Sequence, residues 1–298
     1  MRRLTVQQEQ PDTGGAPESA VGRSAPASPQ PRHYGGFLAA LRAVTRGVLL
    51  VALTGVILVL WGLAALPRRN PAEVRRRVSR HWARGCCRIL GARVNLSGSL
   101  PVAPALVVSN HLSYLDILVL MSIAPCRFVA KREVAGWPVI GFLAQRAGTL
   151  FVVRGEGKEA GTVLEGMGRA LEEGDVVVFF PEGTTSSGER VLPFKSGLLA
   201  RAARDGLPVW PIALSHAPHD RRLDAGLVLC WSGQQSLVTH LWRVAGLPGF
   251  EARVVAGDVP VTLPDRKALA QALECHVTAL YERIARGRRH ARIGPGDE

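Results

Sequence analysis

An uncharged apolar segment near the N-terminus constrains this chain more than any other feature of its sequence. The segment runs from Gly47 to Leu66, and Thr54 is its only clearly polar side chain. At about 1.5 Å per residue, a helix of this length spans roughly 30 Å, which is the thickness of the hydrocarbon core of a bilayer. We therefore predict a membrane helix over residues 47–66. A hairpin that enters one leaflet and a buried core helix are the alternatives.

The segments on either side of the apolar run have their own composition. Residues 1–33 hold five prolines and few large apolar side chains, so we predict a disordered arm there, because such a chain buries too little surface to offset the entropy of ordering. Residues 71–91 carry arginine at every fourth position, in the order Arg76, Arg80, Arg84 and Arg88. This spacing forms a basic stripe on one helical face. A basic amphipathic helix suits an anionic membrane surface, although an ordinary solvated helix has the same pattern.

The balance of charge indicates the kind of partner and the side of the membrane. The chain has 37 basic and 24 acidic residues, a formal net charge of +13, which favours an anionic partner, either nucleic acid or an acidic bilayer surface. No zinc-finger, helix-turn-helix or aromatic-rich strand pattern supports nucleic acid. Arginines that follow an apolar segment predict a cytoplasmic location for the downstream part. We expect an inner (cytoplasmic) membrane protein with membrane-anchoring helices over 34–93 and a folded domain over 94–298, on the cytoplasmic side.

The folded domain alternates between β-rich and helical stretches. The β-rich runs are 105–109, 127–130, 149–153, 176–180, 208–214, 227–231 and 252–257, and the helix candidates are 113–123, 137–147, 158–173, 195–205 and 265–287. This alternation predicts an α/β fold with a mixed, mostly parallel sheet covered by helices. The five cysteines lack the C-x-x-C spacing of a metal or redox site, so we interpret them as small core residues and expect no metal.

A histidine and an acid follow the first strand of this domain. His111 comes directly after the strand 105–109, and Asp116 begins the apolar helix that follows. On a regular helix two side chains five residues apart point about 140° away from each other, so a turn must bring His111 and Asp116 together. Imidazole in that position can accept a proton from a hydroxyl while the carboxylate fixes its tautomer. The alternative is a capping box, Ser113-x-x-Asp116, which needs no catalytic role.

Two later segments also end a strand in polar residues. The first is Gly148-Thr-Leu-Phe-Val-Val-Arg154, and the second is Phe180-Pro-Glu-Gly-Thr-Thr-Ser186. Ligands in open α/β sheets bind beyond the carboxyl ends of the strands. We therefore expect these two segments to lie with His111 at one site.

These motifs together resemble the glycerolipid acyltransferases, whose best-known members acylate lysophosphatidic acid. His111 to Asp116 fits the H-x-x-x-x-D motif of that family, and residues 148–154 match its G-x-x-F-x-x-R block. Phe180 to Thr184 match F-P-E-G-T, and residues 208–212 resemble the fourth block. The order and spacing agree across roughly residues 100–215, so the resemblance covers the first half of the predicted domain.

The resemblance implies a function and a set of site residues. It implies transfer of a fatty-acyl group from acyl-CoA or acyl-carrier protein to the hydroxyl of a lysophospholipid, 1-acylglycerol-3-phosphate or similar, with neither a metal nor another cofactor. His111 would be the general base and Asp116 its partner. Loop donors near Gly183 and Thr184 would meet the oxyanion. Arg154, with Lys131 as its helper, would hold the polar head. Glu182 would order that pocket or contact the hydroxyls of the head. Lys195 would contact the donor's phosphates or be a solvated lysine.

One position departs from the family pattern. Lysophosphatidic acid enzymes usually carry arginine where this chain has Thr185. A phosphate monoester would lose a charge-assisted bond there, so lyso-ornithine lipid or another lysolipid is the alternative acceptor. Two rivals belong to other classes. A serine hydrolase would need a G-x-S-x-G elbow, which this sequence lacks, and a catalytically silent membrane scaffold would need only the arginines.

Overall fold

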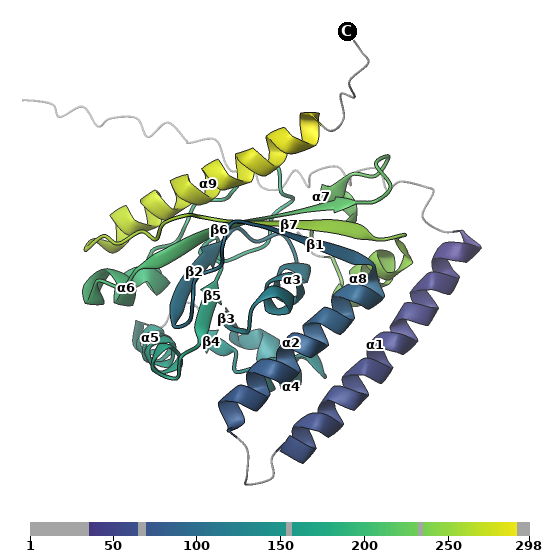
Figure 1. Cartoon of the computed structure of the whole chain (residues 1–298), viewed down its shortest axis with the longest axis horizontal. Helices are drawn as coiled ribbons and strands as arrows, with labels where there is room; N and C mark the ends of the chain where they lie inside the picture. Colours follow the sequence, from purple (N-terminus) through teal and green to yellow (C-terminus); the bar gives the residue numbers. More distant parts are fainter. Residues whose placement is uncertain (1–35, 65–69, 153–156, 232–234, 291–298) are drawn as a thin grey trace, which may run out of the picture. The chain divides into compact units, whose positions relative to one another are not determined.

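The computed structural model of the chain describes residues 36–64, 70–152, 157–231 and 235–290. Figure 1 shows these parts as ribbons around a central sheet. The arm predicted over residues 1–33 lies outside the described residues.

The sheet has seven strands in the order β1-β7-β6-β2-β5-β3-β4. The pairs from β6 to β4 are parallel, whereas β7 runs antiparallel to β6 and parallel to β1. The strands are β1 (Ala92–Ser97), β2 (Ala105–Ser109), β3 (Cys126–Lys131), β4 (Leu150–Val152), β5 (Val176–Phe179), β6 (Val209–Pro218) and β7 (Phe250–Ala256). The predicted mixed, mostly parallel sheet is confirmed.

Helices cover both faces of this sheet (Figure 1). They are α1 (Phe37–Ala64), α2 (Pro71–Leu90), α3 (Leu115–Ile123), α4 (Ile140–Arg146), α5 (Gly157–Glu172), α6 (Ala200–Asp205), α7 (Ala225–Val228), α8 (Leu237–Gly246) and α9 (Arg266–His290), with short 3-10 turns η1 (Arg132–Gly136) and η2 (Gly197–Leu199). Alternate residues of β2 face opposite layers, as the two-residue period of a strand requires. Leu106 and Val108 pack in one cluster with Leu273 of α9, while Val107 packs in another with Val119 of α3.

One predicted strand is wrong. The run 227–231 is apolar and its three central residues are buried, but it does not pair with the sheet. Its first residues belong to α7, and the backbone N–H groups of Leu229 and Cys230 donate back to the carbonyl of Ala225. The run is therefore apolar because it is buried beneath other elements, and not because it is a strand.

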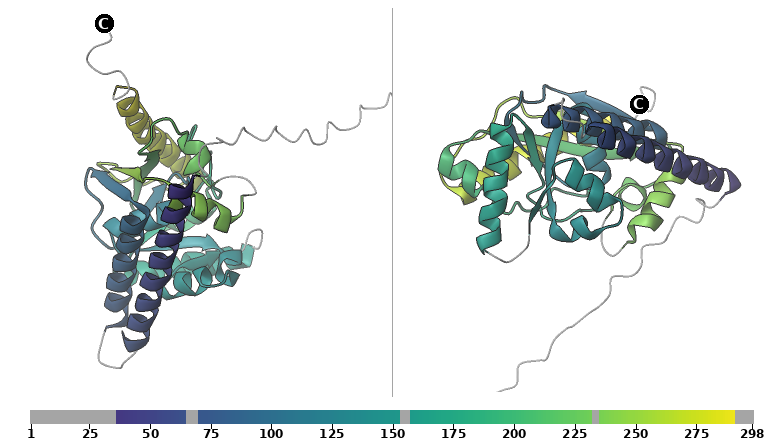
Figure 2. Two further views of the ribbon diagram at one scale, coloured as in Figure 1. Left: turned by 90° about the vertical axis from the view of Figure 1, so that its right-hand side faces the viewer. Right: turned by 90° about the horizontal axis from the view of Figure 1, so that it is seen from below.

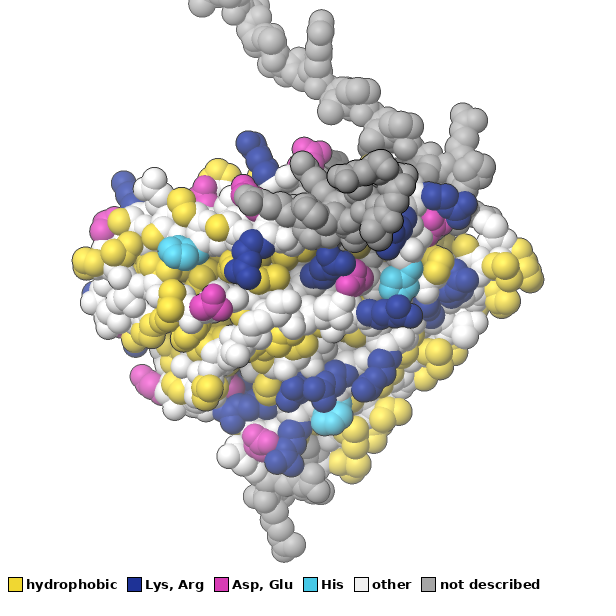
Figure 3. Space-filling view, turned by 45° about the horizontal axis from the view of Figure 1, so that its top comes forward, with side chains coloured by type: hydrophobic (Ala, Val, Ile, Leu, Met, Phe, Trp, Pro, Cys, Tyr) yellow, Lys and Arg dark blue, Asp and Glu magenta, His cyan; other side chains and the backbone are white. Residues whose placement is uncertain are grey.

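The predicted membrane helix is the central and C-terminal part of α1, which lies beside α2 (Figure 2). The helix from Phe37 to Leu63 is long and apolar enough to cross a membrane, and 11% of its most apolar window is buried. Hydrophobic side chains run along the right-hand edge of Figure 3, where α1 lies. Since α1 is continuous from 47 to 64, the apolar run does not fold into a hairpin of its own over these residues.

Two arginines attach the first turns of α1 to the folded domain. Arg42 donates to the carbonyl of Gly246 at 2.7 Å, and Arg46 donates to that of Leu247 at 2.6 Å. These carbonyls end α8, where a helix has unpaired acceptors and the negative end of its dipole. The contact therefore places positive charge where α8 can stabilise it.

Three of the four arginines in the basic stripe of α2 contact the domain, whereas Arg88 is exposed. This corrects the expectation that the stripe as a whole faces a membrane surface. Arg80 donates to the carbonyl of Ile123 at 2.7 Å, and Arg84 donates to that of Ser122 at 2.8 Å, so both satisfy the end of α3. Arg76 binds the buried Asp175. Helical periodicity correctly placed these arginines on one face of α2. Their partners are the carbonyls at the end of α3 and the carboxylate of Asp175, and not a lipid surface.

Asp175 is the centre of an ion cluster that joins α2 to the sheet. Its side chain is 1% exposed, and Arg75, Arg76 and Arg127 reach it at 2.7, 2.7 and 2.6 Å. Burial would raise the pKa of Asp175, but the hydrogen bonds from Arg76 and Arg75 hold it below its ordinary value. An ionised Asp175 therefore fixes α2 against β3 and the start of β5.

Candidate active site

The site begins where β2 ends in the middle of the sheet. Asn110 follows the strand and is buried, and its side chain bridges to β6. Its amide nitrogen donates to the carbonyl of Leu214 at 3.0 Å, and its amide oxygen accepts from the N–H of Leu214 at 2.8 Å. This two-way contact fixes the direction in which the chain leaves the sheet, so the next residue, His111, has a defined position.

His111 and Asp116 are in direct contact, as predicted. Nδ1 of His111 lies 2.8 Å from Oδ2 of Asp116. The same oxygen accepts from the backbone N–H groups of Leu112 and Ser113 at 2.6 and 2.9 Å. The turn therefore wraps around the carboxylate. The contact with Ser113 is half of the capping box considered above, but its hydroxyl does not cap α3, and the carboxylate serves the histidine at the same time.

The buried carboxylate has a second histidine partner. Oδ1 of Asp116 lies 2.6 Å from Nε2 of His216, near the end of β6. Burial alone would raise the pKa of Asp116, but hydrogen bonds with His111 and His216 hold it far below its usual range. Because an ionised carboxylate only accepts hydrogen bonds, Nδ1 of His111 carries a proton and Nε2 keeps its lone pair when the ring is neutral. That nitrogen is the one able to accept a proton.

Aromatic rings fix the plane of the His111 imidazole. The ring of Phe180 is stacked on it with centroids 3.9 Å apart and an interplanar angle of 8°. Phe128 of β3 stacks behind Phe180 at 6.2 Å. The His111 side chain remains 18% exposed, so the imidazole is oriented by packing and still accessible.

The loop after β5 is tied to the His111 turn. The N–H of Ser186 donates to the carbonyl of His111 at 2.9 Å, and the N–H of Trp231 donates to that of Leu112 at 2.8 Å. The hydroxyl of Thr185 donates to the carbonyl of Trp231. The side chain of Thr185 is therefore turned toward the domain.

Gly183 occupies a turn that only glycine adopts without strain. Its φ is +66°, and a Cβ added there would lie 3.0 Å from Nζ of Lys195. Lys195, predicted either for the donor's phosphates or as a solvated lysine, is exposed and lies over this turn. The N–H of Gly183 donates to the carbonyl of Phe180 at 3.0 Å. That loop donors near Gly183 and Thr184 meet the oxyanion stays a prediction. Thr184, the predicted companion of Gly183, is exposed.

Glu182 is the unusual acid of this loop. Its side chain is buried, and neither carboxyl oxygen has a hydrogen-bond partner of good geometry among the described residues. Desolvation raises its pKa to about 8, an effect that the nearby backbone of Leu192 and His111 only partly offsets. A neutral Glu182 beside His111 can order the pocket without adding a second negative charge.

Two predicted residues, Lys131 and Arg154, remain to be placed. Lys131 ends β3 at the same carboxyl edge of the sheet and is exposed. Arg154 lies outside the described residues. Within the described ranges no group of three or more His, Cys, Asp or Glu side chains is placed to hold a metal.

Sequence reasoning missed His216. It lies 100 residues after Asp116, and only the pairing of β6 with β2 brings them together. The available signal was weak, namely a histidine four residues after the fourth motif block, at the end of a mostly apolar run.

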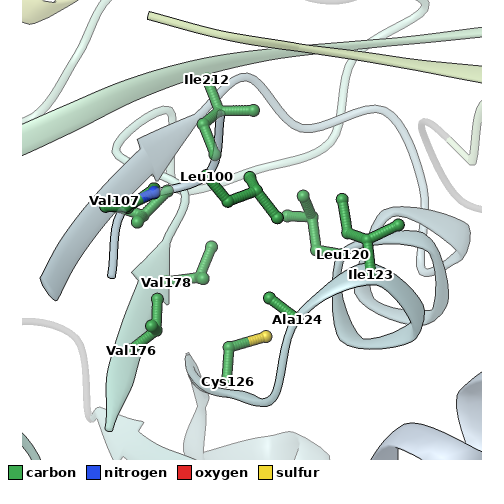
Figure 4. A pocket seen from close by; sticks show the side chains of 10 residues that line it. Leu100, Val107, Leu120, Ile123, Ala124, Cys126, Val176, Val178 and Ile212 are labelled. Atoms are coloured by element: carbon green, nitrogen blue, oxygen red, sulfur yellow. The ribbon is translucent and has the colours of Figure 1, made fainter. Parts of the chain in front are cut away.

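A small cavity lies in the apolar layer between the sheet and α3. Its volume is about 20 Å³, and Figure 4 shows Val107 of β2, Val178 of β5 and Leu120 of α3 pointing into it. Such a volume accommodates roughly one water molecule. This conformation therefore has no room for an acyl chain in that cavity.

Comparisons with known proteins agree on one family. A family model described as Acyltransferase matches residues 93–215. A lyso-ornithine lipid O-acyltransferase from Rhizobium meliloti is 36% identical over 225 residues, which cover 70% of this chain and 77% of the relative. A 1-acyl-sn-glycerol-3-phosphate acyltransferase from Neisseria meningitidis serogroup B is 32% identical over 212 residues, with 70% and 82% covered. The crystal structure of a 1-acyl-sn-glycerophosphate acyltransferase from Thermotoga maritima has the same fold, with a TM-score of 0.61, 21% identity, and 83% of this chain and 95% of that chain covered.

The raised pKa of Glu182 predicts a pH dependence of stability. Between an unfolded pKa of about 4.3 and the folded value of about 8, the folded chain keeps a proton that the unfolded chain releases, so stability falls as the pH rises through that window. Glu182→Gln should remove most of this fall when the melting temperature is measured from about pH 5 to 8. Glu165→Gln, which changes an exposed glutamate of α5, is the matched control. A wild-type pH dependence in Glu182→Gln would contradict the assignment.

Proposed function

This chain belongs to the acyltransferase family, and on that basis we propose that it transfers a fatty-acyl group from a thioester donor to the hydroxyl of a lysolipid, with His111 as general base. The donor in this proposal is acyl-CoA or acyl-carrier protein. The observation that carries the proposal is the 2.8 Å contact between His111 and Asp116. It leaves Nε2 of an accessible imidazole able to take a proton at the carboxyl edge of the sheet.

The proposed reaction is a direct transfer. Nε2 of His111 takes the proton of the acceptor hydroxyl, whose oxygen attacks the carbonyl carbon of the thioester. The C–S bond then breaks, the thiolate leaves, and the imidazolium returns the proton to that sulfur. Asp116 stabilises the imidazolium while it exists. The products are the acylated lipid and the free thiol of the donor.

The acceptor in the proposal is a lysolipid without a terminal phosphate monoester. The relatives include both a lyso-ornithine lipid and a 1-acyl-sn-glycerol-3-phosphate acyltransferase. Thr185 favours the first type of acceptor, because its neutral side chain bonds to the carbonyl of Trp231. In the part of the chain that the structure describes, Lys131 ends β3 at this edge and Lys195 lies over the turn at Gly183. Arg154, with Lys131 as its helper, stays the predicted residue for the polar head.

We further propose that α1 inserts into the inner membrane, with the catalytic domain on its cytoplasmic side. Support comes from the exposed apolar surface of α1, on which Val51 is 74% exposed. Leu143 of α4 packs in one buried cluster with Ile57 and Trp61 of α1, so α4 lies against this helix. A bilayer would cover the side chains of α1 that stay exposed.

The base is tested by His111→Ala. Loss of general base catalysis lowers rates by about 10²- to 10⁴-fold, so free-thiol release from acyl-CoA with a lysolipid should fall by that amount. His276→Ala, which removes an exposed histidine from α9, should retain the wild-type rate. An active His111→Ala would exclude the base role, and an inactive wild type with every donor and acceptor would favour the silent scaffold.

The acceptor is tested by a competition in which lysophosphatidic acid and lyso-ornithine lipid are offered together with one donor. Thr185→Arg should shift the product ratio toward phosphatidic acid by about tenfold, which corresponds to ~1.4 kcal/mol of selective binding. Thr185→Ser keeps the hydroxyl and is the matched control. A wild type that strongly prefers lysophosphatidic acid, with the same ratio in Thr185→Arg, would reject the proposed acceptor.

Membrane insertion is tested by alkaline carbonate extraction of membranes that contain the full chain. A carboxylate near the bilayer centre costs about 2.5 to 3.5 kcal/mol, so Val51→Asp should release protein that the wild type retains. Val102→Asp changes a 90% exposed valine in the loop between β1 and β2 and should behave as wild type. Equal retention of the two variants would count against insertion of α1.

A further inference from the structure

His216 and its neighbour Ser215 are buried polar residues near the end of the otherwise apolar strand β6. The His216 side chain is 0% exposed, and its ring meets Phe250 of β7 edge to face, with centroids 5.8 Å apart. His216 lies directly after the residues matched by the family model, 93–215. An ordinary core position would hold an apolar side chain here.

The contact between His216 and Asp116 completes the coordination of a buried charge. Oδ2 of Asp116 accepts hydrogen bonds from the His111 turn, and Oδ1 takes the contact with Nε2 of His216 at 2.6 Å. The two oxygens are therefore held from opposite sides. An ionised carboxylate accepts only, so Nε2 of His216 must be the donor.

We propose that His216 is a positioning residue for the transfer reaction and that it acts through Asp116. Its N–H prevents rotation of the carboxylate about the bond to Cβ, which keeps Oδ2 directed at Nδ1 of His111. The inference rests on the proposed role of Asp116 and adds a third residue to the catalytic pair. Because β6 supplies that residue, the strand beside β2 helps to set the orientation of the base.

The loss of this contact has a defined physical consequence. Asp116 is 0% exposed, so no water replaces the lost donor, and Oδ1 becomes a buried charged acceptor without a partner. The carboxylate then either rotates toward another donor or takes up a proton. Both changes weaken its hold on His111, and a misplacement of about 1 Å at a reacting group costs up to roughly 10²-fold in rate.

The test is a set of three substitutions in the full chain, assayed by thiol release with acyl-CoA and a lysolipid. His216→Phe keeps the ring shape and removes the donor. His216→Gln can place an amide N–H near the position of Nε2, whereas His216→Asn is too short to do so. We expect kcat to fall about 10- to 100-fold in His216→Phe and His216→Asn, with KM changed less than about twofold. His216→Gln should retain most of the wild-type rate.

A purely structural role would produce a different pattern. It would lower the melting temperature of all three variants and would lower kcat in proportion to the loss of folded protein. His216→Gln and His216→Asn would then have the same kcat. That result would overturn the proposal, and so would wild-type kcat in His216→Phe. If His216→Phe does not fold, the comparison of His216→Gln with His216→Asn decides alone, because the two new side chains are both amides and differ by one methylene group.

A double-mutant cycle with Asp116→Asn tests the route of the effect. If His216 acts through Asp116, His216→Phe should change the residual kcat of Asp116→Asn by less than about twofold. An undiminished 10- to 100-fold loss in that background would overturn the proposed route. The cycle also separates the two proposals: full activity in Asp116→Asn rejects the mechanism, whereas an impaired Asp116→Asn with a normal His216→Phe rejects only the role of His216.

Discussion

A single negative charge, buried without access to water, organises the centre of this molecule. Asp116 can remain ionised there only because two histidines and two backbone N–H groups surround it. These groups come from the turn after β2 and from the end of β6. The carboxylate thus joins the loop that holds the base to the strand beside it. Without the negative charge of Asp116, His111 would lose its orienting hydrogen bond, and the N–H groups of Leu112 and Ser113 would lose the acceptor that holds the turn together.

Arginine side chains attach the two N-terminal helices, α1 and α2, to the rest of the domain. Four arginines of α1 and α2 donate to carbonyls that end α8 or α3. Two more bind the ionised Asp175, which burial alone would have made harder to charge. These polar contacts attach one side of α1 and α2 to the domain. The apolar side chains on the other side of α1 remain exposed. The helical pair is therefore part of the catalytic domain and the carrier of its apolar surface.

The part of the site that is local in sequence could be predicted, and the part that depends on strand register could not. His111 and Asp116 lie five residues apart, so a turn and a motif were sufficient to pair them. His216 reaches Asp116 only through the pairing of β6 with β2, which no local pattern specifies. The same limit applies to the 71–91 helix, where periodicity identified the basic face but not the carbonyls that it meets. The run 227–231 is apolar like a buried strand, although it lies outside the sheet, so its composition alone led to the wrong prediction.

The contacts of Arg42 and Arg46 with the end of α8 have a consequence for how the enzyme would find its substrates. They make α1 a rigid extension of the catalytic domain rather than a tether on a loose linker. With α1 in a bilayer, His111 would stay at a nearly constant height above the lipid surface. The acceptor would then arrive by lateral diffusion, and turnover would follow its mole fraction in the membrane rather than its amount per volume of cytoplasm. Dilution of the acceptor by other lipids would slow such an enzyme even when the total amount of acceptor is unchanged.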